Sequence, residues 1–111
     1  MILEGDEHYM DSVIENEEVK RYFVAEIEWI PFEEGGRRSV PYEGARYCPI
    51  IDLGTSETWS IDFICPDFSK TNTVKFSFLS ENAPEDLIEI SIKYRLKEGS
   101  RDVAYLVAKE E

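Results

Sequence analysis

Apolar and polar residues alternate along most of this chain from Tyr22 onward. In YFVAEIEWI (22–30) the odd-numbered positions are apolar, and Glu26 and Glu28 occupy the opposite face. The same period of two recurs in WSIDFI (59–64), TVKFSFL (73–79), LIEISIKYRL (87–96) and DVAYLVA (102–108). Because successive side chains of a β-strand point to opposite faces, this alternation predicts short strands with one buried face each. The residues predicted to face the core are Phe23, Ala25, Ile27, Trp29, Trp59, Ile61, Phe63, Val74, Phe76, Phe78, Ile88, Ile90, Ile92, Tyr94, Val103, Tyr105 and Val107.

A sixth strand is predicted around residues 46–52, and turn-rich segments separate the strands. One such segment is SENAPED (80–86), and another is the hairpin loop LKEGSRD (96–102), where Gly99 favours a tight turn. A chain of 111 residues suits a single domain. These features predict an all-β fold, a six-stranded antiparallel barrel or sandwich, and alternation by itself does not separate these two.

Residues 1–21 differ from the rest of the chain and are assigned to a separate acidic segment. They contain seven acidic residues against Lys20 and Arg21, a net charge of −5. Met10, Val13 and Ile14 have helical spacing, so we expect a short helix or an acidic arm here. The predicted organisation is therefore residues 1–21 followed by a barrel in residues 22–111.

The charge of the whole chain bears on its partners. With 12 basic and 24 acidic residues the formal net charge is −12, which repels phosphate backbones and anionic lipids. No apolar run approaches the length of a membrane span, and the N-terminus lacks the pattern of a signal peptide. We expect a soluble, cytoplasmic protein that binds a protein partner, with nucleic acid and membrane disfavoured and the oligomeric state open.

The sequence carries no recognisable catalytic or metal-binding pattern. His8, the sole histidine, lies in the acidic segment, and Cys48 and Cys65 are too far apart for a zinc-binding pair. Two small, mostly buried thiols are the expectation for the cysteines. No GxxxxGK[ST] loop is present to cradle a nucleotide. We therefore expect no cofactor, no metal and no enzymatic activity.

The most unusual stretch is FEEGGRRSVPYEGARYCP (32–49), which joins the first predicted strand to the next. Gly35 and Gly36 permit a tight reversal, and Pro41 and Pro49 stiffen the second half of the stretch. Its arginines have two interpretations. They could pair with Glu33, Glu34 and Glu43 and pin the loop to the barrel, or they could form an edge that binds an anion or a partner. The candidate partner-binding residues, with the two tyrosines expected to be exposed, are Arg37, Arg38, Tyr42, Arg46, Tyr47, Lys97 and Arg101.

The same motifs resemble a known family. A strand followed by EEGGR (33–37), Pro41 and GARYCP (44–49) is similar to the opening of the C-terminal β-barrel, domain III, of elongation factor Tu and related translation GTPases. EGSR (98–101) before a strand of small and β-branched residues resembles the closing hairpin of that barrel. The two matches bracket residues 22–108. The resemblance implies a six-stranded Greek-key barrel without its GTPase part, and it places Arg37 and Arg101 at positions that lie near transfer-RNA in the family.

Two functions follow as hypotheses. The first is a non-catalytic protein-interaction module, of inhibitor or immunity type, because the family barrel contacts other proteins and a very acidic domain suits a basic partner. The alternative is a translation or ribonucleoprotein accessory factor that keeps a weak RNA contact through Arg37 and Arg101.

Overall fold

The computed structural model describes residues 20–54 and 57–110, which form strands joined by loops and two short 3₁₀ turns. The predicted N-terminal helix or acidic arm lies almost wholly outside the described residues. The helical elements of residues 20–54 and 57–110 are these two 3₁₀ turns, and neither is long and apolar enough to cross a membrane. The elements are β1 (Phe23–Trp29), η1 (Phe32–Glu34), β2 (Arg46–Tyr47), β3 (Ile50–Asp52), β4 (Thr58–Ile64), β5 (Thr73–Phe78), η2 (Glu85–Leu87), β6 (Lys93–Glu98) and β7 (Arg101–Lys109).

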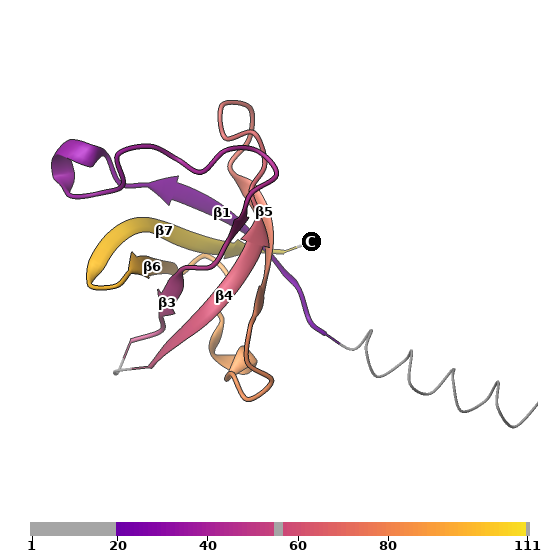
Figure 1. Cartoon of the computed structure of the whole chain (residues 1–111). Coiled ribbons are helices and arrows are strands. Elements are labelled where there is room, and N and C mark those ends of the chain that lie inside the picture. The colour runs from indigo at the N-terminus through magenta and orange to yellow at the C-terminus, as the bar shows by residue number, and fades with distance from the viewer. Residues whose placement is uncertain (1–19, 55–56, 111) are drawn as a thin grey trace, which may run out of the picture.

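The strands close into an antiparallel barrel, as Figure 1 shows. The order of pairing is β4–β3–β6–β7–β1–β5, and β5 pairs back with β4. β2 and β3 both pair with β4 and act as one strand, interrupted at Cys48 and Pro49. Proline lacks the N–H that a ladder needs, which explains the interruption. The predicted six-stranded barrel is thus confirmed, and closure rules out the sandwich.

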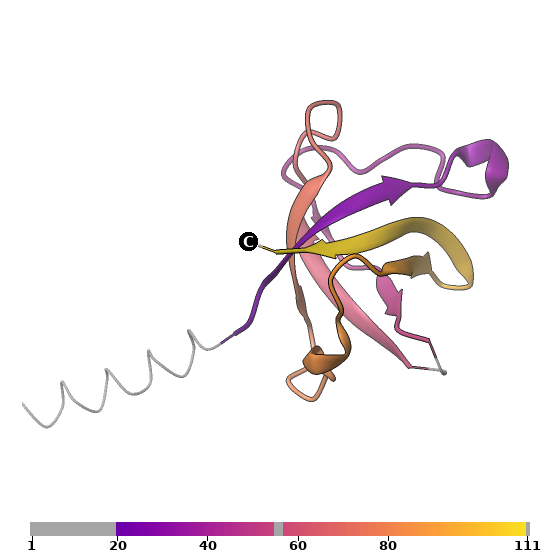
Figure 2. The same ribbon diagram turned by 180° about the vertical axis from the view of Figure 1, so that it is seen from behind.

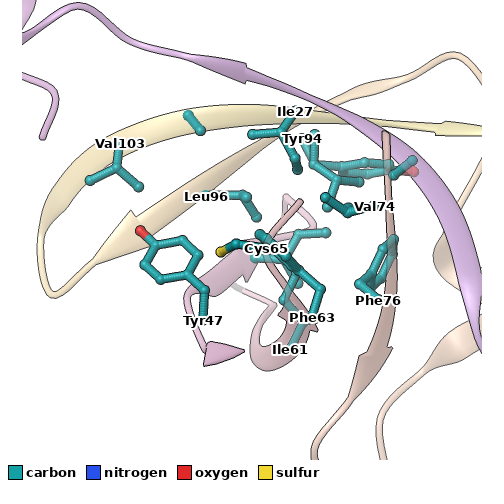
Figure 3. Packing of buried hydrophobic residues seen from close by; sticks show 14 of the residues in the cluster. Ile27, Tyr47, Ile61, Phe63, Cys65, Val74, Phe76, Tyr94, Leu96 and Val103 are labelled. Atoms are coloured by element: carbon teal, nitrogen blue, oxygen red, sulfur yellow. The ribbon is translucent and has the colours of Figure 1, made fainter. Parts of the chain in front are cut away.

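The core occupies the interior of the barrel and follows the predicted alternation on β1, β4 and β5. Ala25 and Ile27 on β1, Ile61 on β4 and Phe76 on β5 are buried. Figure 3 shows that side chains of these strands converge with Leu96 of β6 and Val103 of β7 in the space between the strands. An apolar interior of this kind is the main source of stability for such a domain.

On β7 the predicted core face is partly wrong. Ala104, Leu106 and Ala108 point inward and are fully buried, whereas Tyr105 and Val107 are only half-buried. The pairing with β6 shifts at Leu96, so that Leu96 lies opposite Ala104 while Lys97 lies opposite Asp102. This β-bulge inserts Val103 as an extra residue, which is also buried, and reverses the alternation beyond it.

The predicted strand 87–96 is wrong in its first half. β6 begins only at Lys93, and Ile90 and Ile92 are 49% and 45% exposed. Ser91 has φ of 72°, a left-handed conformation that a strand does not contain, and its N–H binds Ala108 C=O. The apolar alternation of residues 88–92 is therefore broken by one backbone turn.

Candidate functional site

The 32–49 stretch begins with a reversal that depends on its two glycines. η1 ends at Gly35, which has φ of 105°, and the N–H of Gly36 binds Pro31 C=O at 3.0 Å. A Cβ on Gly36 would lie 1.9 Å from Ile30 O, so no other residue fits without moving the chain. This close approach starts the return of the chain toward β2, and the η1 turn and the β6–β7 hairpin project from the same end of the barrel (Figures 1 and 2).

Arg37, the first residue after the glycines, joins this loop to the β6–β7 hairpin. Its Nη1 forms an ion pair with Glu98 Oε2 at the end of β6, and Tyr47 on β2 donates its hydroxyl hydrogen to the same oxygen. The guanidinium of Arg37 also lies 5.3 Å from the centre of the Tyr47 ring. We call Arg37, Tyr47 and Glu98 the hairpin network, because it holds three separate segments together.

The hairpin network shifts the ionisation of all three groups. Partial burial favours protonation of Glu98, but the hydrogen bonds from Tyr47 and Arg37 outweigh it and hold the pKa of Glu98 below its usual value. Burial raises the pKa of Tyr47, and its bond to Glu98 adds to that shift. Burial alone would lower the pKa of Arg37, yet Glu98 raises it. At neutral pH the network therefore contains one cation, one anion and one neutral phenol.

The carboxylate partners predicted for the arginines are not those found. Arg37 binds Glu98, and Arg46 Nε binds Asp62 Oδ2 at 2.9 Å on β4. The guanidinium of Arg38 lies 4.7 Å from the centre of the Phe32 ring. None of these contacts involves the nearby glutamates of the loop. The loop is pinned to the barrel, as one of the two interpretations held, but by carboxylates on β4 and β6.

The remaining predicted site residues divide into paired and available groups. Lys97 Nζ binds Asp102 Oδ1 at 2.7 Å across the hairpin, and this hydrogen bond lowers the pKa of Asp102. Arg101 is exposed, and its positive charge helps to lower the pKa of Glu98. No carboxylate among residues 20–54 and 57–110 forms an ion pair with Arg38 or Arg101. These two arginines are the predicted cations that remain available at this end of the barrel.

The two tyrosines of the loop have opposite environments. Tyr42 is 79% exposed, as expected. Tyr47 is only 9% exposed and packs edge-on against Phe63 at 5.6 Å between ring centres, so the expectation of an exposed Tyr47 is wrong. The reason is that Tyr47 occupies the inward position of the short strand β2, where its ring faces the same interior as Leu96 and Cys65 (Figure 3).

The exposed apolar residues Phe32, Val40 and Ile64 are not among the site residues predicted from the sequence. The turn containing Tyr42 is bound to Cys65, the residue after β4, by hydrogen bonds from Gly44 N–H to Cys65 C=O and from Cys65 N–H to Ala45 C=O, each 2.8 Å. Ile64, next to Cys65, is 60% exposed. We define the loop–hairpin surface as the exposed side chains of Phe32, Arg38, Val40, Tyr42, Ile64 and Arg101. The outward position of Ile64 in the alternation of WSIDFI was the signal available for it.

The cysteines match the expectation only in part. Cys65 is buried, and burial raises the pKa of its thiol, whereas Cys48 is exposed. Both are free thiols. In the part of the chain that the structure describes, no three histidine, cysteine or acidic side chains gather to hold a metal ion.

Comparison of the chain with protein-family models, with curated proteins and with solved structures finds no match.

Proposed function

We propose that this barrel is a non-catalytic protein-interaction module that binds its partner through the loop–hairpin surface. The observation that carries the proposal is the hairpin network, which fixes an irregular loop and a hairpin from opposite parts of the sequence beside each other. Binding residues are often found on loops that a rigid scaffold positions. The barrel supplies that scaffold here.

The composition of the surface supports a protein as the partner. Tyrosine and arginine are enriched in protein interfaces, and Tyr42, Arg38 and Arg101 are exposed together with Ile64 and Val40. Exposed apolar side chains can bury apolar area against a partner, and available guanidinium groups can form directional hydrogen bonds with it. The resemblance to the elongation factor Tu barrel, in which this barrel contacts other proteins, favours the same role. An inhibitor or immunity type of module is a finer form of this proposal.

The alternative is a translation or ribonucleoprotein accessory factor, and Arg101 is the residue that favours it. Arg37, the other position suggested by the resemblance, is engaged with Glu98 and partly covered. Arg38 and Arg101 could each neutralise one phosphate, but strong binding to nucleic acid needs several such contacts. The net charge of −12 opposes them further. We therefore place protein binding ahead of RNA binding.

A paired capture experiment tests the proposal. The wild-type chain, a Tyr42→Ala/Arg38→Ala variant and a Leu87→Ala/Glu89→Ala control would be immobilised and exposed to lysate of the source cell. The control residues are exposed and precede β6, at the end of that strand opposite to the β6–β7 hairpin. We expect at least one protein that binds wild type and control and is lost with the loop variant. Partners that bind all three baits equally would contradict the proposed surface.

The same samples distinguish the alternative. Nuclease treatment should leave the captured protein in place if the contact is direct. Micromolar binding of total transfer-RNA that Arg101→Ala abolishes, with the fold intact by circular dichroism, would replace the protein-binding proposal with the RNA alternative.

A further inference from the structure

β1 extends beyond the end of β5, and this leaves part of one edge of β1 without a partner strand. β5 pairs with β1 as far as Glu26, and the last hydrogen bond between them runs from Ile27 N–H to Asn72 C=O at 2.9 Å. On its other edge β1 stays paired with β7 as far as Trp29. The chain before Asn72 leaves β1 through a turn in which Lys70 and Thr71 bind back to Asp67. The edge from Ile27 to Trp29 is therefore open on the β5 side.

The main-chain groups of this edge are available for hydrogen bonding. In an antiparallel ladder, alternate residues direct their N–H and C=O to opposite neighbours. Ile30 N–H binds Val103 C=O on β7, whereas Ile27 N–H binds Asn72 on the other side. Trp29 follows the direction of Ile27, so its N–H and the C=O of Ile27 point to the open edge. No described residue hydrogen-bonds to either group.

A shallow pocket lies at the same place. Its volume is about 340 Å³, and it is lined by Glu26, Ile27, Glu28, Trp29, Asn72 and Val107. The side chain of Ile27 is buried in the barrel, so this residue lines the pocket with its main chain. Val107 contributes an apolar wall from the neighbouring strand β7. The open edge is thus reachable from outside.

Two carboxylates stand at the rim of this pocket. Glu28 pairs with Lys93 at 3.2 Å and Glu26 with Lys109 at 3.8 Å, and all four side chains are about half exposed. Exposed ion pairs of this kind contribute little to stability, so a cation on a partner can take the place of either lysine at small cost. Among the described residues, the pocket itself is lined by these two acidic residues and by no basic one, and the whole chain carries a net charge of −12, so a basic ligand is favoured over an acidic one.

We propose that the open edge of β1 at Ile27–Trp29 binds an extended, lysine- or arginine-bearing segment of a protein partner, which adds a short strand to the barrel. A residue of that segment donates its N–H to Ile27 C=O and accepts the N–H of Trp29, the main-chain contacts of strand addition. Its basic side chains meet Glu26 and Glu28, which share one face of β1. This inference deepens the proposed protein-binding function by naming the chemistry of one bound segment, and it rests on that function.

The test uses the full-length ¹⁵N-labelled protein and the peptide acetyl-Lys-Val-Lys-Val-Lys-amide at low salt. We expect amide shifts of Ile27, Glu28, Trp29 and Asn72 to change on titration. The Glu26→Gln/Glu28→Gln variant should bind about three- to tenfold more weakly, because it loses two surface charge contacts. The matched control Glu81→Gln/Glu89→Gln removes the same charge from exposed positions between β5 and β6 and should bind as wild type does.

A peptide whose central lysine is methylated on its main-chain nitrogen separates strand addition from charge attraction. This peptide keeps its charges but has no main-chain N–H at that residue to donate to Ile27 C=O. We expect it to bind more weakly than the parent peptide. Equal binding of the two peptides, equal weakening by both double variants, or shifts confined to other residues would each overturn the inference. A Tyr42→Ala variant should bind the peptide normally, so loss of the loop-dependent partner and loss of peptide binding remain separate results.

Discussion

The two long connections of the barrel, residues 30–45 and 79–92, both place apolar side chains on the surface but are held in different ways. The first is tied down by charged side chains, chiefly Arg37 to Glu98. The second is tied by neutral groups. Tyr94 donates its hydroxyl hydrogen to Leu87 C=O at 3.2 Å and accepts the N–H of Glu89 at 2.8 Å. The charge of the two connections differs as well. Two arginines offset two of the three glutamates in the first connection, whereas the second has no basic residue beside Glu81, Glu85, Asp86 and Glu89.

This difference favours the first connection over the second for the binding surface that we propose. Tyr42 and Ile90 are both exposed. Only the segment of Tyr42 also contains an available guanidinium group, that of Arg38, and is attached to the β6–β7 hairpin, through Arg37. The first connection therefore combines fixed geometry, apolar area and hydrogen-bond donors. We give it precedence for this reason.

The comparison also separates the features that the sequence reveals from those that it hides. The alternation on β1, β4 and β5 predicted the buried face correctly, because one residue in two faces the core wherever a strand is regular. It failed beyond the bulge at Val103 on β7, where the alternation reverses, and around the left-handed Ser91, where the predicted strand is interrupted. Neither residue has a sequence signature as specific as a glycine.

The hairpin network shows a second limit. The tight turn at Gly35 and Gly36 was predictable from local residue preferences. The partners of Arg37 were not, because Glu98 is 61 positions away in the chain. Proximity in the sequence favoured Glu33 and Glu34 as the ion-pair partners of Arg37. The folded barrel instead brings Arg37 and Tyr47 to Glu98 on the hairpin.

The largest expected effect lies in the strand that comes after the second connection. Leu96 on β6 is fully buried, so Leu96→Ala should lower the free energy of unfolding by roughly 2–5 kcal/mol, the usual cost of a large cavity in a packed core. Urea denaturation monitored by tryptophan fluorescence measures it. A loss as small as that of a surface substitution would show that β6 is not packed as described.

An intermediate effect is expected at the hairpin network. Glu98→Gln leaves Arg37 without its carboxylate and should cost about 1–2 kcal/mol at pH 7, discounted for the partial exposure of the pair. Since the pKa of Glu98 is lowered by folding, its contribution is complete above the ordinary pKa of a glutamate and is lost as the pH falls through the lowered value. The wild-type protein should therefore lose more stability on acidification than the variant does.

Urea denaturation of both proteins between neutral and acidic pH checks this sign. Glu89→Gln, in the second connection, is the matched control and should change stability by no more than about 0.5 kcal/mol. Identical pH profiles for wild type and Glu98→Gln would mean that the loop is not held by this ion pair, and the contrast between the two connections would fail.

The smallest effect is expected at Ile90, where the alternation and the structure disagree. A strand over 87–96 would bury this residue, and its truncation would then cost as much as that of Leu96. In the structure Ile90 is 49% exposed and forms a single bridge with Ala108 before the turn at Ser91. Ile90→Ala should therefore lower the free energy of unfolding by less than about 1 kcal/mol. A loss comparable to that of Leu96→Ala in the same urea titration would show that residues 88–92 pack as a core strand, and the second connection would then be part of the barrel wall.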